Sequence, residues 1–153
     1  FRFRFAKLIE IWFEKIIGDG NNVRSMVYID NLAQGLILSA LERKASGNTY
    51  WIADEYAYTM NQILNTIERL LSDEFNQTCK FTRLRLPNFV GEIALAFDKV
   101  IQFFGFYNQK IHVLSEMNKN IACSIDKAKD ELGYTPSISL EEGMWRSLND
   151  FYS

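Results

Sequence analysis

The chain has 153 residues, of which 48% are hydrophobic and 24% charged, and its formal net charge is −2. Such values are typical of an ordinary globular protein with one core, so we predict a single domain over residues 1–153. The slightly negative charge argues against a nucleic-acid partner held by bulk electrostatics. With two cysteines and one histidine, neither a disulfide framework nor a metal site is expected, and a reducing, cytoplasmic setting is the default prediction.

The first third of the chain alternates between helix and strand signals. Residues 6–17 carry apolar side chains at helical spacing, and a glycine at position 18 can end that helix. Residues 18–22 have the composition of a turn, and residues 23–29 read as a strand. Asp30 is a predicted N-cap for a helix whose apolar stripe runs to Leu41, and residues 48–53 are predicted to form a second strand.

The middle of the chain begins with a capping box. Thr59 and Gln62 have the spacing at which a hydroxyl and an amide satisfy each other's backbone N–H groups, and a helix follows. Residues 79–86 predict a third strand, which Pro87 ends. Residues 88–106 are strongly apolar, but three charged side chains interrupt them, so we predict a buried or interface helix rather than a membrane span.

The end of the chain is well delimited. A short helix is predicted to start at residues 124–126 and to end at Gly133, with Pro136 at the expected distance beyond. Ser139 and Glu142 form a second capping-box pattern that opens the last helix. Alternating strands and helices predict an α/β fold.

No complete active site is visible in the sequence. Gly18 and Gly20 follow a predicted helix, whereas the glycines of a dinucleotide-binding loop follow a strand. There is no Tyr-x-x-x-Lys pair and no nucleophile elbow. His112 has no carboxylate partner in the nearby sequence, so a structural role is predicted for it. We therefore assign no catalytic, cofactor-binding or metal-binding residue.

Three stretches carry a resemblance to a known family. GDGNNVRSMVYIDNLAQGLILSAL resembles the turn, arginine, strand, acidic corner and helix of extended short-chain dehydrogenases/reductases, the NAD-dependent epimerase/dehydratase group. GNTYWIADEYAYTMNQILNTIERL resembles their next strand and helix, and SIDKAKDELGYTPSISLEEGMWRSLNDFY is similar to their C-terminal signature. The resemblance covers residues 18–72 and 124–153.

The resemblance implies the C-terminal, substrate-binding half of a Rossmann-type enzyme. In that family the N-terminal half carries the glycine-rich NAD or NADP loop and the Tyr-x-x-x-Lys pair, and neither occurs here. Because the chain starts at Phe1 rather than at methionine, we expect a fragment that is inactive on its own. The parent protein is expected to use NAD or NADP, to act on a small-molecule substrate such as a nucleotide sugar, and to form a homo-oligomer.

Arginines are the candidate substrate ligands. In nucleotide-sugar epimerases the arginine that opens this strand contacts the substrate pyrophosphate, and the matching position is Arg24. A guanidinium suits phosphate oxygens because it offers a fork of permanently charged donors; a surface salt bridge is the competing interpretation. Arg83 and Arg85 are candidates for a second positive charge. Asp30, in the acidic corner, is predicted to be a helix cap rather than a catalytic group.

Two alternatives stay open from the sequence. The apolar residues 88–106 resemble the reductase and 3β-hydroxysteroid-dehydrogenase-like branch of the family, whose substrates are apolar alcohols or ketones. An apolar helix could line such a pocket, although a place in the core is the commoner reason for one. The other alternative is a non-catalytic remnant or interaction module.

Overall fold

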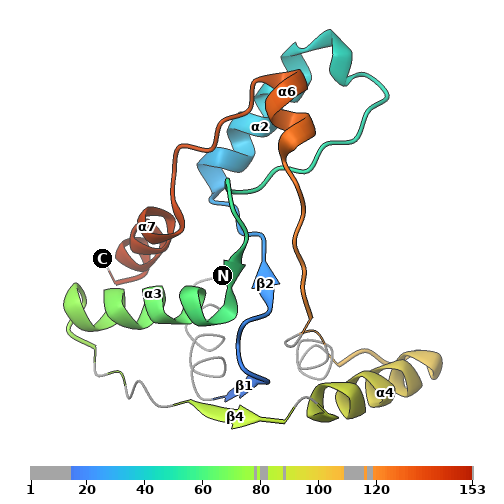
Figure 1. Ribbon diagram of the computed structural model, residues 1–153, viewed down its shortest axis with the longest axis vertical. Helices are drawn as coiled ribbons and strands as arrows, with labels where there is room; N and C mark the ends of the chain where they lie inside the picture. Colours follow the sequence, from blue (N-terminus) through green and yellow to red (C-terminus); the bar gives the residue numbers. More distant parts are fainter. Residues whose placement is uncertain are drawn as a thin grey trace. The chain divides into compact units, whose positions relative to one another are not determined.

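The computed structural model describes residues 15–77, 79, 83–87, 89–108, 116 and 119–152 (Figure 1). The chain divides into two compact units, each assembled from two separate stretches of sequence. Unit 1 comprises residues 1–22 and 80–120, and unit 2 comprises residues 23–79 and 121–153. The single domain over residues 1–153 stays a prediction.

Unit 2 contains a small antiparallel strand pair. β2 (Val23–Arg24) pairs with β3 (Tyr58–Thr59), and Arg24 also forms a parallel bridge with Ile121. The predicted strand over residues 23–29 therefore ends at Arg24. The strand predicted over residues 48–53 was wrong: one backbone hydrogen bond leads from Asp54 N–H to the Met26 carbonyl at 2.7 Å, but these segments form no ladder.

Helix α2 (Ile29–Leu41) starts one residue before the predicted cap. The N-cap is Tyr28, whose side chain makes no capping hydrogen bond, so the prediction that Asp30 is the cap was wrong. Asp30 lies in the first turn, where a negative charge is favourable beside the positive end of the helix dipole. The buried positions of α2 are Asn31 and Gly35, while the side chain of Leu36 in its predicted stripe is 61% exposed.

The hydrophobic core of unit 2 lies around helix α6 (Asp126–Leu132). Its buried members are Ala53, Ile125, Ala128, Leu132 and Tyr134. Gly133 ends α6 at φ 65°, the left-handed conformation expected of a C-terminal glycine. The predicted boundaries of this helix are confirmed.

A short 3₁₀ turn, η1 (Arg43–Ala45), follows α2, and two longer helices complete the described part of unit 2. Helix α3 (Met60–Asp73) packs against helix α7 (Leu140–Tyr152). The capping box predicted at the start of α3 is present with both of its hydrogen bonds. At the start of α7, Ser139 Oγ accepts from the N–H of Glu142 at 3.3 Å.

In the part of unit 1 that the structure describes, a parallel strand pair is followed by the long helix α4 (Phe89–Phe103). β1 (Lys15–Ile17) pairs with β4 (Leu84–Leu86). The helix predicted over residues 6–17 was wrong at its C-terminal end, because residues 15–17 are extended; residues 6–14 lie outside the described residues. Pairing with β4 explains the difference, since a partner strand overrides local helical spacing.

Helix α4 (Phe89–Phe103) confirms the helix predicted in the apolar region, but not its burial. Its buried positions are Gly91, Ala94 and Asp98. Its large apolar side chains face outward, as Phe97 illustrates with 62% exposure. In the described part of the chain, no helix is long and apolar enough to cross a membrane. His112 lies outside the described residues.

Candidate functional site

Arg24 occupies the middle position of a three-segment arrangement in unit 2. On one side its backbone is in register with Tyr58 of β3. On the other side Ile121 N–H donates to the Val23 carbonyl at 2.8 Å, and Ser25 N–H donates to the Ile121 carbonyl at 2.9 Å. Backbone hydrogen bonds on both sides fix the path of the chain at Arg24, a half-buried residue, so its side chain starts from a rigid backbone.

A hydroxyl continues this bracing beyond the strand. Cys123 N–H donates to Ser25 Oγ at 3.0 Å, so the residue after Arg24 is tied to the segment that leads into α6. Ser25 is therefore explained as the side-chain partner of a distant backbone N–H group. The sequence predicted the strand but could not identify its second neighbour, 98 positions further along the chain.

A buried carboxyl group, Asp54, lies close to the start of α2. It accepts hydrogen bonds from the Asn31 amide at 3.2 Å, from the Tyr58 hydroxyl and from the Tyr28 backbone N–H. Burial raises the pKa of Asp54 above its usual value, and these three hydrogen bonds act in the opposite direction. Tyr58 is the residue in register with Arg24, so the carboxyl joins the strand pair to the start of the helix.

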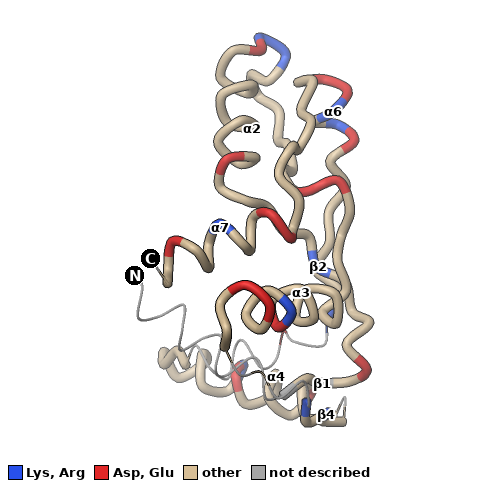
Figure 2. The backbone as a smooth tube through the Cα atoms, turned by 90° about the vertical axis from the view of Figure 1, so that its left-hand side faces the viewer, with Lys and Arg blue, Asp and Glu red and all other residues tan. Residues whose placement is uncertain are grey.

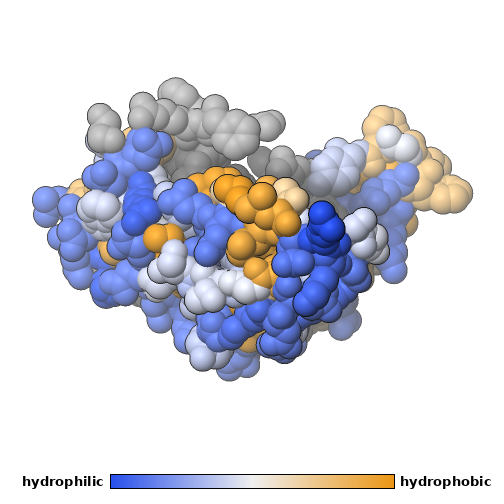
Figure 3. All heavy atoms as spheres, turned by 90° about the horizontal axis from the view of Figure 1, so that it is seen from above, coloured by the Kyte–Doolittle hydropathy of each residue, from blue (hydrophilic) through white to orange (hydrophobic). Residues whose placement is uncertain are grey.

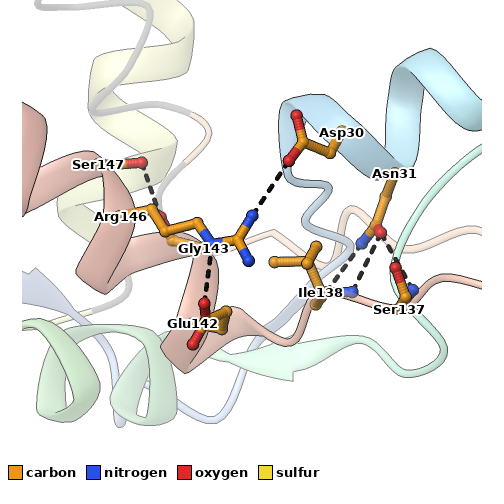
Figure 4. A network of polar contacts seen from close by, with 8 residues as sticks. All are labelled: Asp30, Asn31, Ser137, Ile138, Glu142, Gly143, Arg146 and Ser147. Atoms are coloured by element: carbon orange, nitrogen blue, oxygen red, sulfur yellow. Dashed lines mark hydrogen bonds and ion pairs between the residues drawn. The ribbon is translucent and has the colours of Figure 1, made fainter.

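Asn31 is the centre of the polar network (Figure 4). Its amide donates to the Ile138 carbonyl at 2.8 Å, and its oxygen accepts from the N–H groups of Ser137 and Ile138, each at 3.1 Å. The side chain is only 1% exposed. The Asn31 side chain thus hydrogen-bonds the backbone of the segment that precedes α7, a role that was not predicted from the sequence.

Arg146 links α7 to the first turn of α2. Its guanidinium contacts Asp30 at 3.1 Å and Glu142 at 2.8 Å (Figure 4). It also lies over the Tyr28 ring, 5.7 Å from the ring centroid. The Tyr28 ring also packs on Gly143, where an added Cβ would approach it to 2.9 Å. Asp30 is thus an ion-pair partner of Arg146, and its non-catalytic role stays a prediction.

The two other candidate ligands belong to unit 1. Arg83 is half-buried directly before β4, and Arg85 is exposed in β4. The pKa of Asp19 is lowered, mainly by hydrogen bonds from Asn21 and to a smaller extent by the positive charge of Arg85. Arg85 therefore lies near the turn after β1, whereas Arg24 belongs to the other unit.

The chemistry that these groups offer is binding and positioning. Arg24 supplies a fixed positive charge, while Asp54 and Asn31 are occupied by hydrogen bonds that hold segments together. Among the residues that the structure describes, no three acidic, histidine or cysteine side chains gather as a metal site.

Comparison with known proteins identifies relatives over nearly the whole chain, although no family model matches. An uncharacterised protein of Sinorhizobium fredii, y4nL, is 50% identical over 95% of this chain and 41% of its own length. A 3beta-hydroxysteroid-dehydrogenase/decarboxylase of Arabidopsis thaliana, isoform 2, is 27% identical over 89% of this chain and 26% of its own. A UDP-glucuronate 4-epimerase of Thermodesulfobacterium geofontis is 29% identical over 96% of this chain and 36% of its own length.

Solved structures show the same fold. UDP-glucose 4-epimerase of Thermotoga maritima matches 94% of this chain and 38% of its own, with a TM-score of 0.59 at 20% identity. UDP-glucuronic acid 4-epimerase of Bacillus cereus, solved in complex with NAD, matches 99% of this chain and 40% of its own, with a TM-score of 0.56 at 18% identity.

These comparisons confirm the resemblance predicted from the sequence. The chain is related to the C-terminal portion of NAD-dependent epimerases and short-chain dehydrogenases/reductases, proteins with a Rossmann-type α/β fold. It spans about two fifths or less of the length of these relatives.

Proposed function

We propose that the chain forms the substrate-binding portion of an NAD(P)-dependent enzyme that acts on an apolar alcohol or ketone. The observation that carries this proposal is the outward apolar face of α4. Its members are Phe89, Ile93, Phe97 and Val100, which are 52–62% exposed. Spacings of three and four residues place them on one side of the helix.

An apolar surface of this kind suits a substrate that is itself apolar. Binding sites for small molecules are lined mainly by hydrophobic and aromatic side chains, with a few polar groups that set orientation. The relationship to a 3beta-hydroxysteroid-dehydrogenase/decarboxylase supports this substrate class. Hydride transfer and the bound NAD or NADP are assigned to the N-terminal part that the relatives carry, so the chain alone is expected to be inactive.

Arg24 supports a second candidate function, a nucleotide-sugar epimerase or dehydratase. Its guanidinium is carried on a strand braced by backbone bonds on both sides, which is the preorganisation that a phosphate ligand requires. The relationship to UDP-glucuronate 4-epimerase agrees with this candidate. Arg83 and Arg85 would be further ligands, but they belong to the other unit. In both cases a cytoplasmic location and a homo-oligomeric state stay predictions.

The two candidates can be separated with a chimera in which the N-terminal part of y4nL precedes residues 1–153. Reduction of a 3-oxosteroid would be followed by NADPH and NADH absorbance, and epimerisation of UDP-glucuronate by chromatography. We expect ketone reduction, with kcat/KM about tenfold lower in Phe97→Ala, because an apolar contact of this size contributes roughly 1–3 kcal/mol. Lys44→Ala, a change at an exposed position of η1, is the matched control.

The nucleotide-sugar candidate predicts the opposite result in the same assays. Epimerisation without ketone reduction, lost in Arg24→Ala and kept in Phe97→Ala, would refute the first candidate and support the second. A charge-assisted hydrogen bond from Arg24 is worth about 1.5–3 kcal/mol, so its loss should weaken nucleotide-sugar binding at least tenfold. NAD-linked turnover by residues 1–153 alone would refute the assignment of catalysis to the N-terminal part.

A further inference from the structure

The backbone register at Arg24 brings three side chains next to one another on one face of the strand pair in unit 2. Arg24 is paired with Tyr58 of β3 on one side and with Ile121 on the other. Residues that are directly paired on neighbouring strands carry their side chains on the same face. The side chain of Arg24 is therefore flanked by an aromatic and an aliphatic side chain. Ile121 is 45% exposed, so a ligand can reach this face.

The polar groups next to Arg24 are used within the protein. The Tyr58 hydroxyl donates to the buried carboxyl group of Asp54, so the part of Tyr58 beside Arg24 is its ring. The N–H groups of Ser25 and Ile121 donate to backbone carbonyls of the neighbouring strands. A ligand at this face would thus meet a charged guanidinium with apolar groups on both sides.

The other positive charges of unit 2 belong to other elements, and Figure 2 shows them dispersed along the chain. Three of them form ion pairs with carboxylates, namely Arg69, Lys129 and Arg146. Lys127 donates to Asn48 and lies over the Tyr50 ring, 4.7 Å from the ring centroid. These four charges are therefore committed to contacts within unit 2.

The last two positive charges, Arg43 and Lys44, belong to η1, which follows the C-terminal end of α2. Helix α2 has 13 residues and is about 20 Å long, and it separates η1 from the strand that carries Arg24 (Figure 1). Figure 3 views the molecule from the end where η1 lies, and most side chains nearest the viewer are hydrophilic. Both residues are exposed to solvent, whereas Arg24 is half-buried in the strand pair.

A single guanidinium between apolar side chains suits a carboxylate better than a pyrophosphate. Its planar fork can bind both oxygens of one carboxylate and balance the single negative charge. A pyrophosphate carries more than one negative charge, and the remainder would face apolar groups that cannot pair with it. Apolar groups are instead suited to contact the carbon atoms that adjoin a carboxylate.

We propose that Arg24 binds the carboxylate of an apolar oxo acid or hydroxy acid, whose adjoining carbon atoms contact Ile121 and the ring of Tyr58. This inference rests on the proposed function, because it adds a carboxylate to the apolar ketone or alcohol assigned there. Arg24 is then a specificity-determining residue that selects the free acid over a neutral derivative with the same carbon skeleton.

The inference is tested by titrating ¹⁵N-labelled residues 1–153 with octanoate and with octanamide, its neutral analogue, and recording amide chemical shifts by NMR. We expect octanoate to shift the signals of residues 23–25 and 121–123 and to bind roughly tenfold more tightly than octanamide, because a bidentate charge-assisted contact is lost in the amide. Inorganic pyrophosphate should bind more weakly than octanoate at these signals.

Variants at position 24 separate the charge from the fork. Arg24→Gln should abolish the preference for octanoate, because it keeps part of the side-chain length without the charge. Arg24→Lys should leave an intermediate preference, since an ammonium group supplies the charge without the planar fork. Lys44→Gln, at an exposed position of η1, is the control and should keep the full preference. The amide spectrum of each variant shows directly whether it is folded.

Several results would overturn the inference: no binding of octanoate, equal affinity for octanoate and octanamide, or a preference that Arg24→Gln leaves unchanged. Tighter binding of pyrophosphate at the same signals would overturn it in favour of a phosphate site. Ketone reduction by the chimera tests the proposed function separately. Equal kcat/KM for 4-oxodecanoate and its methyl ester would overturn the carboxylate assignment and leave the proposed function standing. Acid-selective binding without ketone reduction would refute the proposed function and leave the carboxylate site in place.

Discussion

Replacing Asn31 by alanine should destabilise unit 2 more than any exposed substitution, because its side chain satisfies four groups at once. It bonds to Asp54 Oδ1, to the carbonyl and N–H of Ile138, and to the N–H of Ser137. Each buried group left without a partner costs roughly 1–3 kcal/mol. Ser137 is exposed and water can reach part of this segment, so we expect a total loss of about 2–4 kcal/mol.

The assay is urea unfolding followed by far-ultraviolet circular dichroism. With a denaturant slope of roughly 2 kcal/mol per molar, the midpoint for Asn31→Ala should fall by about 1–2 M. Thr135→Ala, at an exposed position after α6, is the control and should change stability by less than about 0.5 kcal/mol. An unchanged midpoint for Asn31→Ala would show that the network does not hold α2 to the segment before α7.

Three further changes test other parts of unit 2. Gly35→Ala should lower the thermal midpoint, because the new Cβ would crowd Ile52 at 2.7–2.9 Å and overpacking costs about 1–3 kcal/mol, more than the gain in helix propensity; an increase in the midpoint would refute the close contact. Thr59→Ala should cost about 1 kcal/mol in urea unfolding through loss of the N-cap, whereas Thr59→Ser should restore most of it. Burial raises the pKa of Tyr134 to about 12, above its ordinary value of 10. The folded state therefore holds this proton more tightly, so its contribution to stability is complete below pH 10 and is lost between pH 10 and about 12. Tyr134→Phe should make the loss of stability over that interval smaller, and an unchanged pH profile would contradict the raised pKa.

Prediction from sequence succeeded where a signal is local. The capping box at Thr59 and Gln62 and the glycine that ends α6 depend on residues within one helical turn, so their spacing is sufficient evidence. The site was predicted only in part: Arg24 was placed on a strand, but the roles of Asn31 and Asp54 were missed. Both depend on partners distant in sequence, such as Ile138, 107 positions from Asn31.

The wrong predictions also concern contacts between segments that are distant in the sequence. Helical spacing before Gly18 predicted a helix, yet Lys15–Ile17 pairs with β4, whose residues lie about 70 positions later. The apolar stripe of α2 was correctly recognised as a feature of a helix, but its spacing does not say which neighbour it contacts. Only the structure showed that Asn31 and Gly35 are its buried positions, whereas Leu36 and Ile37 are exposed.

By itself, the sequence determined the α/β class, the start of α3, the end of α6 and the relationship to NAD-dependent epimerases and short-chain dehydrogenases/reductases, because these are properties of residues close together in the chain. The tertiary structure decided which strands pair, that Asp30 binds Arg146 instead of capping α2, and that the apolar faces of α2 and α4 are exposed. Such outcomes depend on the free energy of contacts between distant segments, and that free energy is not encoded in any local spacing.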